Sequence, residues 1–441
     1  MTPRSVSSAT PKGAWIIVLL LFLYMVVNYA DKIVVGLAGV PIIAELTLTP
    51  RDFGLLGSSF FFLYSVSAVI FGFVINRVPT RWVLLFLSLV WGLSQFPIVL
   101  HPAFTTLLLC RVVLGAGEGP AFAVALHAIF KWFPDHERAL PTAILAQGAS
   151  AGVIVAVPAL NWIIVHHSWH LAFGALGIVS LGWAAVWLVL GREGPLDTTP
   201  TSSPAPADVV ARVSQVSYAR LLLSPTFVGV CIAGLGAYTS LSLGVAWFTP
   251  FVIKGLGFSQ ERAGWISVLP WGWGAICSIV TGVASQAMLR NGYTTRGARG
   301  VFAAVPLILG AGLLVLMAVV SAPMVKLALL VTQFGVCGST FVLGPTMLGE
   351  FTPPARRGAV IAIYQAVIGL AGVVAPAVMG NVLDGAATPL EGYLRGYELV
   401  AVVLALAGVA GLALLRPGEE RERMLRASGG SRSPLASTDE A

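Results

Sequence analysis

The sequence AWIIVLLLFLYMVVNYADKIVVGLA occupies residues 14–38 and carries charge only at Asp31 and Lys32. A helix of about twenty apolar residues is long enough to cross the hydrocarbon core of a bilayer. The stretch exceeds the apolar part of a typical secretory signal peptide, and similar stretches follow it, so we expect an uncleaved first transmembrane helix. These stretches predict an all-α polytopic membrane protein.

Twelve transmembrane helices are predicted, in two sets of six. The first set covers residues 14–38, 53–75, 82–100, 103–130, 139–165 and 170–190, and the second covers residues 225–253, 263–288, 300–321, 325–350, 357–383 and 395–415. The segment between the sets is rich in Pro, Ser and Thr, and the end of the chain is charged and rich in Ser and Gly. We therefore expect an N-terminal six-helix bundle, a cytoplasmic linker, a C-terminal six-helix bundle and a disordered cytoplasmic tail, at residues 1–190, 191–224, 225–415 and 416–441.

The composition supports the membrane assignment. Hydrophobic residues make up 57% of the chain and charged residues only 10%, so one water-soluble core would not bury the apolar side chains. The net charge of +7 is concentrated between the apolar stretches, which indicates topology rather than a nucleic-acid surface. The four cysteines lie in apolar runs without CxxC spacing, so neither a metal site nor a disulfide is predicted.

Basic residues set the predicted orientation. With the N-terminus inside, nineteen of the 26 Lys and Arg residues fall on cytoplasmic segments. The external loops hold Arg51, Lys254, Arg262, Lys326 and Arg395. Because cytoplasmic loops carry an excess of basic residues, both termini are expected in the cytoplasm.

The two halves resemble one another at an offset of about half the chain. The pattern Gly152, Pro158 and Asn161 in the fifth predicted helix corresponds to Gly372, Pro376 and Asn381 in the eleventh. Duplicated halves are the usual construction of transporters that alternate access between the two sides of a membrane.

Four ionisable residues lie deep in the predicted helices: Asp31 and Lys32 in the first, and Arg111 and Glu118 in the fourth. Each costs roughly 2.5–3.5 kcal/mol at the bilayer centre, so they must face a polar interior. Arg111 and Glu118 are about two helical turns apart and share a face, whereas Asp31 and Lys32 point about 100° apart. The alternative is that these residues are buried ion pairs that hold the helices in register.

Other polar-tipped residues within the helices are candidates for the lining of a central cavity. We assign Tyr29, Gln147, Tyr364 and Gln365 to substrate binding, while noting that Tyr and Gln also tie helices together. The run from Gly115 to Pro120 fits either ligand access or close helix packing, and the residues alone do not decide between these.

These motifs resemble the major facilitator superfamily, and within it the anion:cation symporter family of sugar-acid, phthalate-type and sialic-acid carriers. Asn28-Tyr29-Ala30-Asp31-Lys32 is similar to the Tyr-x-Asp-Arg of that family. Its most specific signature is similar to Arg111-x6-Glu118-Gly119-Pro120-Ala121-Phe122 followed by Trp132-Phe133-Pro134-x2-Glu137-Arg138-Ala139. The segment Gly72-x3-Asn76-Arg77-x3-Arg81 resembles the loop between helices two and three of the superfamily.

The resemblance implies roles for these residues. Asp31 and Glu118 would be the proton-coupling carboxylates, and Lys32 and Arg111 would bind the substrate or those acids. Asn76, Arg77, Arg81 and Arg138 would belong to the gate.

The sequence departs from the family at several of these positions. Lys32 replaces the usual Arg, and Asn76 replaces the usual Asp. Gly369 stands where many members carry Asn, with Gln365 one turn away, and Gln286 stands at a usual Asp. The changes at Lys32 and Gly369 weaken the expectation of a sugar-acid substrate but not that of the fold.

We expect proton-coupled symport of a small organic anion, such as a sugar acid or an aromatic acid, across a bacterial inner membrane. The expected partners are the anion, protons and lipid, with no cofactor and no metal, and the protein is expected to act as a monomer. An efflux antiporter is the first alternative, although Gly148-x3-Gly152 lacks the Gly-Pro-x2-Gly-Gly pattern of such exporters. A non-transporting sensor is the second alternative. No nucleophile, metal cluster or phosphate loop indicates an enzyme.

Overall fold

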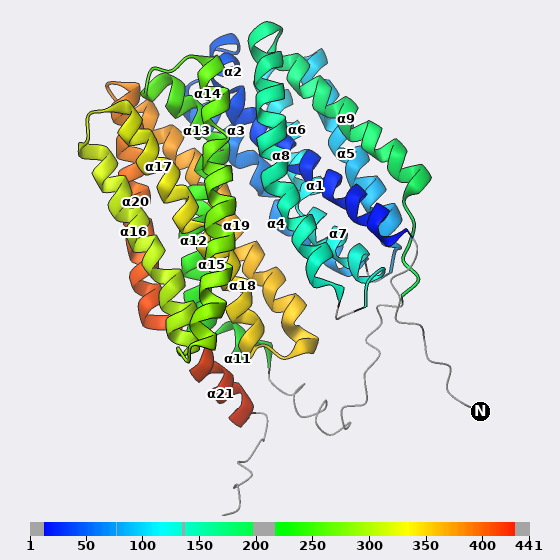
Figure 1. Cartoon of the computed structure of the whole chain (residues 1–441). Coiled ribbons are helices and arrows are strands. Elements are labelled where there is room, and N and C mark those ends of the chain that lie inside the picture. Colours follow the sequence, from blue (N-terminus) through cyan, green and yellow to red (C-terminus); the bar gives the residue numbers. More distant parts are fainter. Residues whose placement is uncertain (1–12, 76, 135–136, 197–216, 428–441) are drawn as a thin grey trace, which may run out of the picture.

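The computed structural model describes residues 13–75, 77–134, 137–196 and 217–427, and these form helices joined by short connections. Twelve stretches within these residues are long and apolar enough to cross a membrane, which confirms the predicted number. Figure 1 shows them as two bundles side by side, blue to green for the N-terminal half and green to red for the C-terminal half. Residue 13 and the linker ends enter the bundles from the same end, which we call the linker end.

The described residues of the N-terminal bundle form nine helices. Its helices are α1 (Ala14–Leu37), α2 (Gly39–Glu45), α3 (Pro50–Phe62), α4 (Tyr64–Val74), α5 (Thr80–Leu100), α6 (Phe104–Glu118), α7 (Ala121–Phe130), α8 (Ala139–His166) and α9 (Trp169–Leu190). The first span is followed by the short helix α2, and the second and fourth spans are each divided in two. The break between α6 and α7 coincides with Gly119-Pro120, where the proline lacks a backbone N–H for the helical ladder.

The C-terminal half follows a short helix, α11 (Tyr218–Leu222). Its spans are formed by α12 (Pro225–Ala246), α13 (Phe248–Pro250), the π-helical turn η2 (Phe251–Gly255), α14 (Gln260–Ile266), α15 (Leu269–Arg290), the π-helical turn η3 (Arg296–Val301), α16 (Phe302–Val319), α17 (Pro323–Cys337), α18 (Ser339–Phe351), α19 (Pro354–Asp384) and α20 (Pro389–Leu414). A final helix, α21 (Pro417–Ala427), follows the last span.

A local cap explains why the second span begins earlier than predicted. At α3, the Thr49 hydroxyl accepts from the Asp52 N–H at 3.1 Å, and the Asp52 carboxylate accepts from the Thr49 N–H at 3.1 Å. This reciprocal cap satisfies two amides that the helix leaves free, with Pro50 at the first helical position. The second span therefore starts at residue 50 rather than 53.

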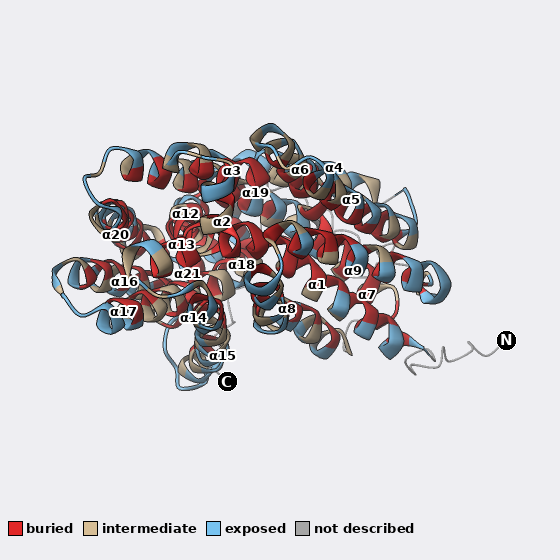
Figure 2. Cartoon of the chain, turned by 90° about the horizontal axis from the view of Figure 1, so that it is seen from above, coloured by how far each residue is buried: buried red, intermediate tan, exposed pale blue. Residues whose placement is uncertain are grey.

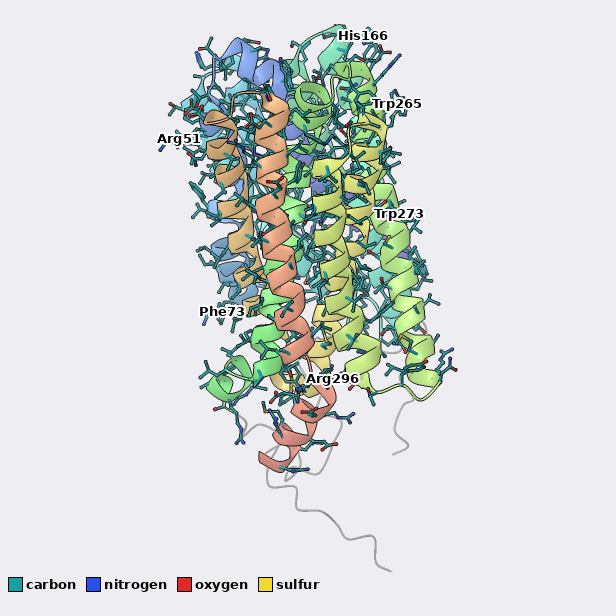
Figure 3. The ribbon with its side chains drawn as sticks, turned by 90° about the vertical axis from the view of Figure 1, so that its left-hand side faces the viewer. Arg51, Phe73, His166, Trp265, Trp273 and Arg296 are labelled. Carbon is teal, nitrogen blue, oxygen red and sulfur yellow. The ribbon has the colours of Figure 1, made fainter. Side chains whose placement is uncertain are left out.

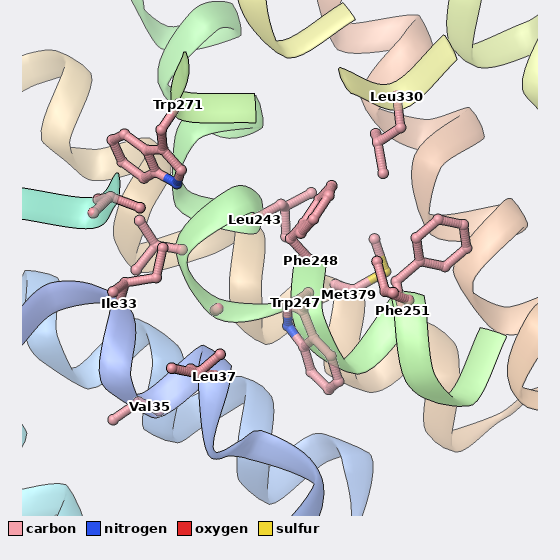
Figure 4. Close-up of a cluster of buried hydrophobic side chains, with 14 of the residues drawn as sticks. Ile33, Val35, Leu37, Leu243, Trp247, Phe248, Phe251, Trp271, Leu330 and Met379 are labelled. Carbon is pink, nitrogen blue, oxygen red and sulfur yellow. The ribbon is translucent and has the colours of Figure 1, made fainter. Parts of the chain in front are cut away.

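The two bundles meet mainly at the end away from the linker. There Gly54 of α3 lies against the Pro376 carbonyl of α19, and Gly36 of α1 lies against the Val245 carbonyl of α12. A side chain at either glycine would collide with backbone, so the close approach of the helices depends on glycine. Figure 4 shows apolar side chains from both bundles, including Ile33 and Trp247, meeting at this contact.

The outer flanks expose apolar side chains, as expected for helices in lipid. Phe73 and Trp265 are 71% and 66% exposed, and Figure 3 shows them at the outside of the molecule. Figure 2 shows buried residues concentrated where helices face one another. In Figure 3, Arg51 and His166 lie toward one end of the helices and Arg296 toward the linker end.

The end of the chain corrects one prediction. Residues 417–427 form α21 instead of belonging to a disordered tail, because Glu420 and Met424 dock against the bundle. The Thr226 hydroxyl donates to the Glu420 carboxylate at 3.3 Å, and Met424 packs in the core cluster that contains Phe227. Residues 428–441 lie outside the described residues.

Lys326 is a second correction. It was expected in an external loop, but it lies in the first turn of α17 and is buried. Its ammonium donates to the Met317 carbonyl at 2.7 Å, one of the carbonyls left free at the end of α16. It is therefore not one of the exposed loop cations on which the orientation was based.

Candidate functional site

The predicted intramembrane charges are all buried inside the N-terminal bundle. Asp31, Arg111 and Glu118 are at most 1% exposed, and the Lys32 side chain is 11% exposed. The structure thus turns all four away from lipid, as their insertion cost requires.

Glycines in α6 and at its end bring these charges close to the second span. Positions Gly115 and Gly119 lie against the carbonyls of Phe60 and Tyr64, at distances that no Cβ would tolerate. Gly117 lies against the Trp91 ring of α5. The glycine run therefore serves close packing, one of the two explanations that the sequence left open.

Lys32 extends from α1 toward Glu118 on α6. Its ammonium lies 3.5 Å from a Glu118 carboxylate oxygen and donates to the Asn28 side-chain oxygen at 2.6 Å. The rings of Tyr29 and Tyr64 lie 4.3 and 5.3 Å from the same nitrogen. Neither Glu118 oxygen has a hydrogen-bond donor among the described residues, so Lys32 is the cation that compensates this carboxylate most directly.

Asp31 points the other way, into the bundle. Its side chain accepts from the Gln95 amide of α5 at 3.0 Å, and its main-chain carbonyl accepts from the Arg111 guanidinium at 3.1 Å. The guanidinium also lies 4.7 Å from the Phe60 ring, which is fully buried. Adjacent residues on α1 thus serve two separate polar clusters, in agreement with their predicted divergence.

Lys32 also faces the contact between the two bundles. Beside it, Tyr29 makes an edge contact with Trp271 of α15, at a ring-centre distance of 5.8 Å. On the other side, Phe61 of α3 makes an edge contact with Tyr238 of α12 at 5.9 Å. A ligand that reaches Lys32 would therefore touch both halves of the protein.

The remaining predicted substrate residues lie at different places. Gln147 on α8 and Gln365 on α19 are exposed, one on each bundle. Tyr364 is fully buried inside the C-terminal bundle, against Gly234 and Gly344. No hydrogen bond joins Lys32 to any of the three, and their binding roles stay predictions.

The predicted gate residues lie at the linker end. Arg77 is exposed, and Arg81 donates to the Leu188 carbonyl at 2.8 Å. Arg138 donates to the carbonyls of Phe133 and Phe130 at 2.9 and 3.0 Å. Asn76 lies outside the described residues, so the predicted loop is seen in part.

Glu193, which was not singled out from the sequence, anchors the start of the linker. Its carboxylate accepts hydrogen bonds from the Thr80 and Arg81 amides at the start of α5 and pairs with Lys131 after α7. Burial tends to raise the pKa of Glu193, but these hydrogen bonds outweigh it and hold the pKa below its ordinary value. A carboxylate is stabilised at a helix N-terminus, but Glu193 is 113 residues from Thr80, so nothing in the sequence indicates this anchor.

A second polar spot lies within the C-terminal bundle. Gln333 of α17 donates to the Ser240 hydroxyl of α12 at 2.7 Å, beside a small hollow that Phe248 and Tyr397 also line. No charged residue lines it. In the described residues, no cluster of His, Cys, Asp and Glu has the arrangement needed to hold a metal ion.

Comparison with known proteins places the chain in a family. The profile of the Major Facilitator Superfamily matches residues 20–376. The chain belongs to this superfamily. Its twelve spans and two bundles are thus those of a major facilitator fold, and the family and its curated relatives are transporters rather than enzymes.

Two curated relatives and one solved structure illustrate the likeness to other major facilitators. The hexuronate transporter of Bacillus subtilis is 28% identical over 275 residues, which cover 62% of this chain and 65% of that protein. The D-galactonate transporter of Escherichia coli is 22% identical over 403 residues, 86% of this chain and 92% of that protein. A bacterial homologue of the human lysosomal transporter Spinster, solved inward-facing and unoccupied, has a TM-score of 0.74 at 17% identity, covering 94% of this chain and 99% of that chain, and shows the fold alone.

Proposed function

We propose that this protein is a secondary active transporter that carries a small organic carboxylate together with protons. The observation that carries the proposal is the position of the Lys32 ammonium, between the Glu118 carboxylate and the contact of the two bundles. The hexuronate and D-galactonate transporters among its relatives support a carboxylate as substrate.

The Lys32–Glu118 pair supplies the coupling. With both groups ionised the pair is neutral, and an arriving carboxylate would meet an ammonium already compensated. When Glu118 is protonated, Lys32 becomes the uncompensated cation, and the substrate takes the place of the Glu118 charge. At about 4 Å and an effective dielectric constant of 20, such a charge interaction is worth roughly 4 kcal/mol before desolvation. Substrate and proton therefore bind together.

Asp31 offers a second place for a proton. It lies beside Gln95 and one helix position from Lys32, within the same bundle. Arg111 fixes the α1 backbone at Asp31 rather than facing the bundle contact, so we assign it to positioning and Lys32 to the substrate. The Tyr29 ring lies beside the Lys32 ammonium. Gln147 and Gln365 are candidates for substrate contacts nearer the linker end.

Alternating access follows from how the bundles meet. Their contact at the end away from the linker closes that side, so the arrangement corresponds to access from the linker end. The excess of Arg and Lys on the linker side supports a cytoplasmic linker and cytoplasmic termini in a bacterial inner membrane. If a cysteine introduced at Ser203 were labelled from outside intact cells by an impermeant reagent, this orientation would be wrong.

Reconstituted liposomes test the function itself. A thermal-shift screen of organic anions first identifies a carboxylate that stabilises the purified protein. An inward proton gradient should then drive accumulation of that carboxylate above its equilibrium level. Accumulation that needs an oppositely directed gradient would favour the efflux antiporter, and binding without any flux would favour a sensor.

A further inference from the structure

We infer that the substrate of this site is a monocarboxylate with a flat aromatic body, rather than a dicarboxylate or a polyhydroxylated sugar acid. This inference rests on the proposed function and names the substrate class of the same site.

One positive charge faces the bundle contact in the middle of the protein. Lys32 and Arg111 are the two basic residues placed deep in the predicted helices, and only Lys32 reaches the contact. Arg111 is 1% exposed, lies behind the Phe60 ring and is hydrogen-bonded to the Asp31 carbonyl. A ligand with two carboxylates would leave the second one without a cation, so the site is suited to a single negative charge.

Two aromatic rings, those of Tyr29 and Tyr64, lie beside that charge, and five more continue from them in ring-to-ring contacts. We call them the aromatic belt, and its members are Tyr29, Phe61, Tyr64, Tyr238, Trp271, Phe334 and Phe341. On one side of Lys32, Tyr29 contacts Trp271, which contacts Phe334 at 5.5 Å. On the other side, Tyr64 contacts Phe61, Phe61 contacts Tyr238, and Tyr238 contacts Phe341, at ring-centre distances from 5.9 to 6.1 Å.

The belt draws its rings from both bundles, in edge and tilted contacts. Rings arranged in this way present faces and edges to a further ring placed among them, which is the geometry that aromatic pairs prefer. A planar ligand anchored to Lys32 through its carboxylate would therefore contact the belt through its body.

The polar groups of the belt are the indole N–H of Trp271 and three phenol hydroxyls. Those of Tyr29, Tyr64 and Tyr238 make no hydrogen bond to another described residue. They are donors for a carboxylate held at Lys32. The Asn28 amide beside them accepts from the Lys32 ammonium through its oxygen, and its NH2 group has no partner among the described residues.

A sugar acid needs more polar partners than the belt provides. Each of its hydroxyls loses water on binding and has to be hydrogen-bonded in return, and a site without enough partners discriminates against it. Gln147 and Gln365 are exposed on α8 and α19 and are not members of the belt. The belt thus favours a ligand whose body is apolar.

Direct binding to the purified full-length protein tests this inference. The probes are benzoate, phthalate, D-gluconate and galactarate, each titrated into the protein at near-neutral pH by isothermal titration calorimetry. We expect benzoate to bind at least about tenfold more tightly than each of the other three. Tighter binding of D-gluconate or galactarate would overturn the substrate class and leave the proposed transporter intact. If none of the four bound, both this substrate class and the proposed transport of a carboxylate would be contradicted.

Two tryptophans of one span provide a matched pair of variants. Trp271 belongs to the belt, whereas Trp265 is 66% exposed on the outer flank. Trp271→Leu should weaken benzoate binding about tenfold, and Trp271→Phe, which keeps a ring, should stay within about threefold of the parent. Trp265→Leu should bind as the parent does, and thermal unfolding of each variant reports its folding. Unchanged benzoate affinity in folded Trp271→Leu would contradict the belt as the binding surface.

Discussion

The Lys32 ammonium lies 3.5 Å from the Glu118 carboxylate, and it donates a hydrogen bond to Asn28 on its own helix. The pair joins the first span to the fourth inside one bundle, yet Lys32 also reaches the contact with the other bundle. A change of charge on Glu118 therefore changes how far the charge of Lys32 is compensated where the two halves meet.

Removing the ammonium tests Lys32 as the anion-binding group. Lys32→Met keeps much of the apolar stem and deletes the charge, so a carboxylate loses its charge-assisted hydrogen bond, worth about 1.5–3 kcal/mol. We expect affinity for the bound carboxylate to fall roughly 10- to 100-fold in a binding titration. Lys32→Arg, which keeps the positive charge, should bind. Equal affinities of Lys32→Met and the parent protein would rule out this role.

Arg111 should matter more for stability than for affinity. Arg111→Ala would remove the donor to the Asp31 carbonyl and leave buried Asp31 and Glu118 poorly compensated, at a cost of about 3–5 kcal/mol. Thermal unfolding should show a clear loss of stability, with Arg111→Lys intermediate. The folded fraction of the variant should keep its carboxylate affinity within about threefold. A variant that is as stable as the parent but no longer binds would make Arg111 a substrate contact instead.

The fold was predictable to a large extent because hydrophobic length is a direct physical constraint. The spans starting at Ala14 and Pro225 begin where the sequence predicts, and the second span is displaced by the local cap at Thr49. The helix α21 was missed because its composition is polar. The spacing of its charged residues nevertheless indicates a helix, because Glu419 pairs with Arg423 and Glu422 with Arg426 at four-residue intervals.

The charged residues of the site were predictable, but their partners only in part. Asn28 precedes Lys32 by four residues, so helical spacing alone brings the two side chains together. Gln95 is 64 residues from Asp31, and nothing in the sequence indicates which face of the third span meets the first. Tyr364 was expected in the cavity, yet Gly234 and Gly344 allow its ring to pack inside the C-terminal bundle. Such packing is decided by tertiary contacts.

Asn161 should hold the bundles closed at the end away from the linker. It accepts from the Gln260 amide at 3.0 Å and donates to the Glu261 carbonyl at 3.3 Å, both across the bundle contact. Asn161→Ala removes both hydrogen bonds, each worth about 0.5–1.5 kcal/mol, and should raise the fraction of molecules in which the bundles are separated at that end.

Spin labels measure this change. Labels at His166 and Ala387, on a background without the four native cysteines, report the distance between the bundles at this end. Asn161→Ala should increase the long-distance population. Asn381→Ala is the matched control, because Asn381 donates only within α19, to the Ala377 carbonyl at 2.9 Å. Identical distance distributions for both variants would exclude Asn161 as a latch.

Glu193 should make stability depend on pH. Its pKa is held below the ordinary value in the folded protein, so its contribution is complete above the pKa of about 4.3 in the unfolded chain and is lost as pH falls through the folded value. Glu193→Gln should lower the unfolding temperature at neutral pH by a few degrees, for a loss of about 1 kcal/mol. At acidic pH the variant and the parent should converge. A constant difference across this range would mean that the Glu193 charge is not responsible.

Transport by Glu118→Gln in liposomes shows whether Glu118 couples the proton to the substrate. Glutamine resembles the protonated acid permanently, so the loaded carrier can still pass from side to side, whereas a proton gradient can no longer change the charge that faces Lys32. Counterflow of the radiolabelled carboxylate identified by binding should therefore persist, while accumulation driven by an imposed pH gradient is lost. Gradient-driven accumulation close to that of the parent protein would exclude Glu118 as the coupling group and assign that role to Asp31.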